Sequence, residues 1–127
     1  MSMRIWPALS LGLVLATASG GAQAAGSHAS SNEAAGRYSI LRGDGKETGC
    51  MLTLDNRAHG PGGFKAQLAP ACRDNGVVIF DPVGWSMDRG RLALTARKGH
   101  KAWFDRGPGG LWRRDAKEGK PLALRPL

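Results

Sequence analysis

The chain has 127 residues, 18 Lys and Arg against 10 Asp and Glu, and a formal net charge of +8 at pH 7. That length predicts one domain, and the positive balance favours acidic partners. The sequence predicts no metal site in this protein. His28, His59 and His100 are isolated, and no C-x-x-C or H-x-x-x-H spacing occurs.

Residues 1–24 are typical of a secretory signal peptide. Arg4 provides a positive start, residues 6–18 are mostly apolar, and Ala22-Gln23-Ala24 fits the small-x-small rule of signal peptidase. A membrane-spanning helix would need about 20 apolar residues, and this run is shorter and broken by Gly and Ser. We therefore expect cleavage after Ala24, or second after Ala25, and a periplasmic or secreted protein with no membrane span.

Residues 25–35 are predicted to form a flexible N-terminal arm, because they contain no large apolar residue. Within it, Ser31 or Asn32 is expected to cap a short helix through Ala35, with Glu33 in the first turn. Residues 36–127 form the predicted folded domain.

That domain is predicted to be all-β, because short apolar or alternating segments are separated by Gly, Pro, Asn and Asp. The expected strands lie at residues 37–41, 50–54, 64–68, 77–80, 85–87, 92–95, 102–105, 111–113 and 122–124. A Gly-rich loop is expected at 55–63, and the apolar run 77–80 is expected to be a strand buried on both sides. Seven to nine short strands predict an antiparallel sandwich or a closed up-and-down barrel.

The cysteines are expected to form one disulfide, because the protein is predicted to be exported. The alternative is two free buried thiols. A bond between Cys50 and Cys72 closes about 22 residues, which the chain-entropy model converts to roughly 3 kcal/mol.

Five aromatic residues are predicted to fill the core. They are Tyr38, Phe64, Trp85, Trp103 and Trp112. Buried aromatic side chains contribute a few kcal/mol each. The alternative is that they line a pocket for one hydrophobic molecule, but a domain of this size leaves little room for a cavity.

No catalytic set is present, and neither enzymatic activity nor a cofactor is predicted. Ser27, Ser30 and Ser31 lie near His28, but nothing on the arm would hold a nucleophile and a base in place. The basic stretches at 97–101 and 113–114 are expected to be solvated strand edges rather than a specific nucleic-acid site.

Several short motifs occur in a familiar order. They are Ala35-Gly36-Arg37-Tyr38-x-Ile40, Gly49-Cys50-x-Leu52-x-Leu54 with Cys72 after a Pro-containing turn, Pro82-Val83-Gly84-Trp85, Leu92-x-Leu94 and Ala102-Trp103-Phe104. With the export signal and the short arm, they make the chain resemble the bacterial Inh family of metalloprotease inhibitors. The resemblance covers residues 35–105 well and the last twenty residues loosely.

The resemblance implies an eight-stranded antiparallel barrel with a Cys50–Cys72 disulfide, in a monomer that binds one molecule of a secreted bacterial zinc metalloprotease. It also implies that the mature arm enters the protease cleft and that its terminal amine approaches the catalytic zinc. Carried over, the inhibitory arm consists of Ala25, Gly26, Ser27, His28 and Ala29. The family's best-known arms carry larger apolar residues, whereas this one is small and polar, which leaves the target open.

The sequence therefore indicates two candidate functions. The first is the inhibitor of a zinc metalloprotease. The alternative is a non-enzymatic envelope module that binds a small ligand or an anionic polymer.

Overall fold

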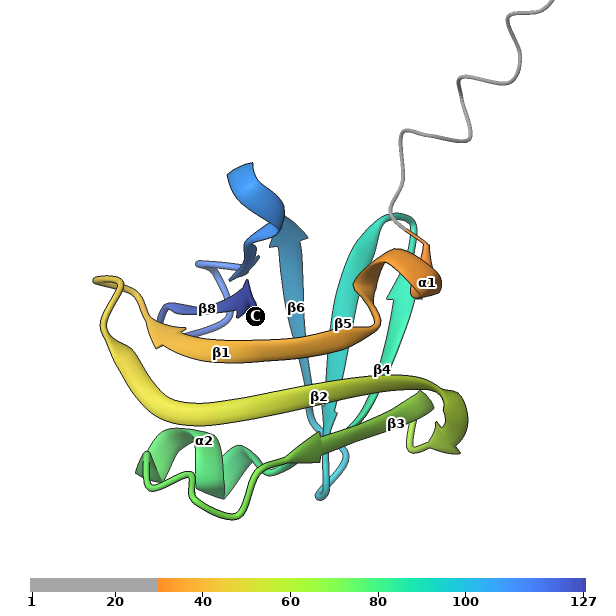
Figure 1. Ribbon diagram of the computed structural model, residues 1–127, viewed down its shortest axis with the longest axis horizontal. Helices are drawn as coiled ribbons and strands as arrows, with labels where there is room; N and C mark the ends of the chain where they lie inside the picture. The colour runs from red at the N-terminus through yellow and green to blue at the C-terminus, as the bar shows by residue number, and fades with distance from the viewer. Residues whose placement is uncertain (1–29) are drawn as a thin grey trace, which may run out of the picture.

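The computed structural model describes residues 30–127; the predicted signal peptide and residues 25–29 of the arm lie outside this part of the chain. Eight antiparallel strands close into a barrel in which each strand pairs with its neighbour in sequence and β8 pairs with β1 (Figure 1). The all-β prediction is confirmed, and the open choice between sandwich and barrel is settled as a barrel. None of the helices in residues 30–127 is long and apolar enough to cross a membrane.

The elements of residues 30–127 are joined by turns and short loops. In order, they are α1 (Ser31–Ala34), β1 (Gly36–Arg42), β2 (Glu47–Gly60), β3 (Gly63–Leu68), α2 (Asn75–Phe80), β4 (Pro82–Asp88), β5 (Arg91–Ala96), β6 (Lys101–Arg106), η2 (Pro108–Gly110), β7 (Trp112–Arg114) and β8 (Leu122–Pro126). Eight of the nine expected strand segments overlap these strands.

The core is the inside of the barrel, which receives every second side chain of each strand. On β2 the inward residues are Cys50, Leu52 and Leu54, all at most 1% exposed, as their alternation predicts. The prediction that Cys50 and Cys72 form a disulfide is confirmed.

A β-bulge at the start of β2 sets the direction of this inner face. Ile40 pairs with Cys50 but Leu41 pairs with Glu47, so Thr48 and Gly49 have no partner across the ladder. Gly49 takes a φ of 78°, which favours glycine, and the Thr48 hydroxyl donates a hydrogen bond to the Ile40 carbonyl at 2.7 Å. The bulge turns Cys50 inward, toward its disulfide partner.

The prediction of a buried strand at 77–80 is wrong, because these residues form most of α2. The Asp74 carboxylate accepts a hydrogen bond from the Val77 amide at 3.2 Å and caps the helix, and Asp81 ends it in a left-handed conformation. Val77 is buried, whereas Ile79 is 73% exposed. A run of four apolar residues cannot by itself separate a strand from a short helix.

The predicted loop at 55–63 is also wrong, because β2 continues to Gly60 and only Pro61 and Gly62 form the turn before β3. The pairing of β2 with β3 is regular except for a register shift between Asp55 and His59. At this shift the buried Trp85 indole donates hydrogen bonds to the carbonyls of Asp55, at 3.3 Å, and Lys65, at 3.1 Å. The indole N–H of this core residue thus finds its hydrogen-bond acceptors where the β2–β3 pairing is irregular.

The aromatic residues divide between the core and the surface. Tyr38, Trp85 and Trp112 are buried, and Phe64 packs against the core with its ring 5.1 Å from that of Trp85. Trp103 is half-buried and lies outside the core cluster, so its predicted place was wrong. Phe104, the next residue on β6, is 1% exposed and occupies the inner position instead.

Candidate functional site

The candidate site is the point where the predicted arm joins the barrel, which we call the arm anchor: residues 30–35 with their partners Tyr38, Asn56 and Arg106. α1 is its first part and is only four residues long. The Ser30 hydroxyl accepts a hydrogen bond from the Glu33 amide at 3.3 Å, so Ser30 is the N-cap rather than Ser31 or Asn32 as expected. Glu33 lies in the first turn, as predicted.

The inner side of the anchor is buried. Ala34 is 0% exposed and belongs to the core cluster, and Ala35 packs against that cluster. The hydroxyl of Tyr38, on β1, donates a hydrogen bond of 2.6 Å to the Ala34 carbonyl. This bond satisfies one of the carbonyls that the end of a helix leaves free. Burial of the ring raises the pKa of Tyr38 above its ordinary value.

The outer side of the anchor is held by polar contacts to distant strands. Asn56 of β2 donates a hydrogen bond from its side-chain amide to the Asn32 side-chain oxygen at 2.8 Å. Arg106 of β6 pairs with Glu33 at 3.3 Å, and its guanidinium also stacks over the Trp112 ring of β7, 5.5 Å from the ring centroid. Each exposed contact is weak alone, but together with Tyr38 they bind α1 to three strands, β1, β2 and β6.

The arm anchor fixes the position of Ser30, the first described residue, on the barrel. The predicted inhibitory residues Ala25, Gly26, Ser27, His28 and Ala29 lie outside the described residues. The contacts of Asn56 and Arg106 with the anchor span 24 and 73 positions in sequence. Sequence reasoning missed both residues, because no local pattern signals a partner so far along the chain.

The carboxylates of Asp105 and Asp115 have structural roles. Arg91 pairs with Asp105 at 2.8 Å and with Asp115 at 2.9 Å, and it stacks over the outer face of Trp103. A backbone hydrogen bond from Lys117, together with the Arg91 guanidinium, holds the pKa of Asp115 below its usual value. Within residues 30–127 no group of three or more His, Cys, Asp or Glu side chains could hold a metal ion.

Comparison with known proteins gives one finding. A family model described as "Protease inhibitor Inh" matches residues 28–125. The match begins just before α1 and ends within β8, so it includes the whole arm anchor and the whole barrel except its last residues. Among curated proteins no match is found.

Proposed function

The chain belongs to the protease inhibitor Inh family, and on that premise we propose that it inhibits a secreted bacterial zinc metalloprotease by inserting its N-terminal arm into the protease cleft. As a member of an inhibitor family, it binds a protease and is not an enzyme. Family membership and the Cys50–Cys72 disulfide indicate a location outside the cytoplasm. We further propose that residues 1–24 are the export signal and that the protein acts in the periplasm or after secretion.

The observation that carries the proposal is the arm anchor. A segment that enters a cleft loses conformational freedom on binding, and a fixed base reduces that loss. Here the base is fixed by one buried hydrogen bond from Tyr38 and by side chains of Asn56 and Arg106. The segment N-terminal to Ser30 is therefore attached at one defined place, at one end of the barrel.

The length of residues 25–30 suits a shallow insertion. Because Ser31–Ala34 is helical, only residues 25–30 can extend, and six extended residues reach at most about 20 Å. The rest of the contact must come from the barrel end around α1. This end supplies Arg106, which is already stacked on Trp112, so its guanidinium is partly immobilised before binding.

The chemistry at the tip would come from the α-amine that cleavage after Ala24 creates. Its pKa of about 7.7–8.0 leaves part of it unprotonated near neutral pH. The free lone pair would replace the water that a catalytic zinc keeps as its fourth ligand. The small side chains of Ala25, Gly26 and Ala29 would then fill little of the subsites beside the zinc, so the amine carries a large share of the affinity.

The test compares three forms of the chain against a purified secreted zinc metalloprotease. The first begins at Ala25, the second has the same sequence with an acetylated α-amine, and the third begins at Ser30. Acetylation leaves every side chain in place but removes the lone pair. We expect the inhibition constant to rise at least about tenfold for the acetylated form, equivalent to about 1.4 kcal/mol, and further for the truncated form.

All three forms retain the arm anchor, so equal melting temperatures are the control for folding. Equal inhibition by the three forms would overturn arm insertion, and no inhibition of any zinc metalloprotease by the first form would overturn the target class. Intact mass of the exported protein establishes the true first residue, because a one-residue difference moves the amine by about 3.3 Å.

A further inference from the structure

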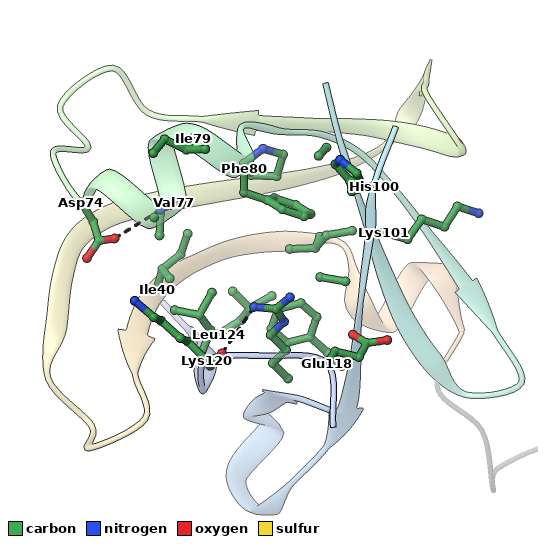
Figure 2. A pocket seen from close by; sticks show the side chains of 18 of the residues that line it. Ile40, Asp74, Val77, Ile79, Phe80, His100, Lys101, Glu118, Lys120 and Leu124 are labelled. Carbon is green, nitrogen blue, oxygen red and sulfur yellow. Dashed lines mark hydrogen bonds between the residues drawn. The ribbon is translucent and has the colours of Figure 1, made fainter. Parts of the chain in front are cut away.

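A cavity of about 590 Å³ opens at the barrel end opposite the arm anchor (Figure 2). β1 runs from Gly36, beside the anchor, to Arg42, which lines this cavity. In Figure 2, Val77, Ile79 and Phe80 lie on one side of the opening, and Lys120, Leu124 and Glu118 lie on the other. Sites for small molecules commonly measure about 300–1,000 Å³, so this cavity, which sequence reasoning did not expect, has a suitable size.

The wall of the cavity is mostly apolar and belongs to the barrel core. Its buried members include Ile40, Val77, Leu94, Ala102, Phe104 and Leu124. Phe80 and Leu122 are half-buried and complete the wall near the opening. An apolar body entering here would be removed from water on several sides.

Arg114 is the unusual member of this wall. On β7 it occupies the same face as the buried Trp112, and it pairs across the sheet with Phe104, an inward residue of β6. Its Nε is buried without a hydrogen-bond partner, and its Nη1 donates one long hydrogen bond, of 3.4 Å, to the Lys120 carbonyl. None of the seven ion pairs found in residues 30–127 includes Arg114. A half-buried guanidinium at the barrel mouth, in none of these ion pairs, favours an anionic ligand.

Positive charges outnumber negative ones around the opening. Lys98, Lys101 and Lys120 line it, and no ion pair in the described chain includes any of them. The two acidic residues of the lining are already engaged. Asp74 pairs with Arg42 and caps α2, and Glu118 accepts a hydrogen bond from the Trp103 amide at 2.9 Å.

We propose that this barrel-mouth cavity binds a small amphipathic anion, whose apolar body packs against the inner wall and whose carboxylate or phosphate group binds Arg114. The lysines at the opening attract the anion and select against cationic amphiphiles. The proposal is independent of protease inhibition, because it uses the other end of the barrel.

The test measures binding of decanoate to the chain that begins at Ala25, by calorimetry and by amide chemical-shift mapping. Decyl phosphate tests the alternative head group, while decanol and decyltrimethylammonium carry the same apolar chain without the anion. We expect saturable one-to-one binding of the two anions, with shifts concentrated around Leu94, Ala102 and Leu124. Binding that is tighter for one of the two anions identifies the preferred head group.

Two variants and one control locate the site. Arg114→Gln should weaken decanoate binding at least about tenfold, because a charge-assisted hydrogen bond is lost. Arg113→Gln changes the neighbouring arginine, which is exposed on the outer face of the same strand, and should leave the affinity unchanged. Leu122→Trp fills the opening while keeping Arg114, and it should abolish binding.

Melting curves confirm that each variant is folded. Equal affinity of Arg114→Gln and the unsubstituted protein would overturn the proposal, as would decanol binding as tightly as decanoate or shifts centred on another surface. Because Leu122→Trp does not touch the guanidinium, unchanged binding by that variant would refute the site even if Arg114→Gln did not fold.

Discussion

Replacing Tyr38 by Phe is the most informative single test of the arm anchor. The substitution removes one hydroxyl and keeps the ring, so the core is not emptied. It deprives the Ala34 carbonyl of its 2.6 Å hydrogen bond, at a residue that is 0% exposed. An unsatisfied buried polar group costs about 1–3 kcal/mol, so we expect the free energy of unfolding to fall by that amount. For a domain of this size, Tm should fall by roughly 4–8 °C per kcal/mol.

The same residue predicts how stability depends on alkaline pH. Burial raises the pKa of Tyr38 in the folded protein, whereas the unfolded chain ionises near a pKa of about 10. Above that pH the unfolded state binds fewer protons than the folded state, so stability falls as pH rises and is unaffected by this group at lower pH. The alkaline loss should be smaller in Tyr38→Phe. Because Tyr38 is the only tyrosine in the chain, tyrosinate absorbance reports on it alone.

The measurements are urea unfolding, spectrophotometric titration and protease inhibition, each with Asn32→Ala as a matched control. That control breaks the exposed Asn32–Asn56 hydrogen bond and should change stability by about 0.5 kcal/mol or less. If Tyr38→Phe is as stable as Asn32→Ala, or if the folded protein forms tyrosinate at about pH 10, the anchor is not held as described. With a loosened anchor, the Tyr38→Phe protein should also inhibit the protease less well at a temperature where it is folded.

Two further changes test the barrel itself by urea unfolding. Replacing Cys50 and Cys72 by Ala should lower the free energy of unfolding by about 3 kcal/mol, because their separation of 22 residues sets the entropy of the closed loop; a loss below about 1 kcal/mol would contradict that account. Gly84→Ala should cost about 1–3 kcal/mol or more, because the new Cβ would lie 1.7 Å from the Pro61 carbonyl oxygen. Its control, Gly107→Ala, has no neighbour closer than 3.5 Å and should be nearly neutral; equal losses in the two would show that Gly84 is not a close approach.

The sequence predicted the parts of the fold that depend on local alternation. Cys50, Leu52 and Leu54 lie inward because a strand directs every second side chain to the same face, and several turns are marked by Gly, Pro and Asp. Alternation failed where two assignments fit equally well. On β6, either Trp103 or Phe104 could face the core, and the pairing with β5 and β7 decides for Phe104.

Other features depended on contacts that local patterns do not encode. α2 forms because Asp74 caps it and because Arg42 and Arg97 pair with the aspartates at its two ends. The arm anchor likewise depends on Asn56 and Arg106, which reach it only when the barrel closes. Arg114 belongs to a basic stretch that looks solvated in sequence, and its pairing opposite Phe104 places it, half-buried, on the inner face of β7.

The arm anchor and the barrel-mouth cavity lie at opposite ends of the same strands, and this distance allows them to be tested separately. β1 leads from Gly36 to Arg42, and β6 leads from Lys101 at the cavity to Arg106 at the anchor. At about 3.3 Å per residue, the two ends of β1 are about 20 Å apart, and substitutions farther apart than about 7–10 Å usually act independently. Arg114→Gln should therefore leave protease inhibition unchanged, and acetylation of the α-amine should leave decanoate affinity unchanged. A change in either cross-measurement would mean that the barrel transmits occupancy of the cavity to the arm, which would make a bound amphiphile a regulator of inhibition rather than a second, unrelated ligand.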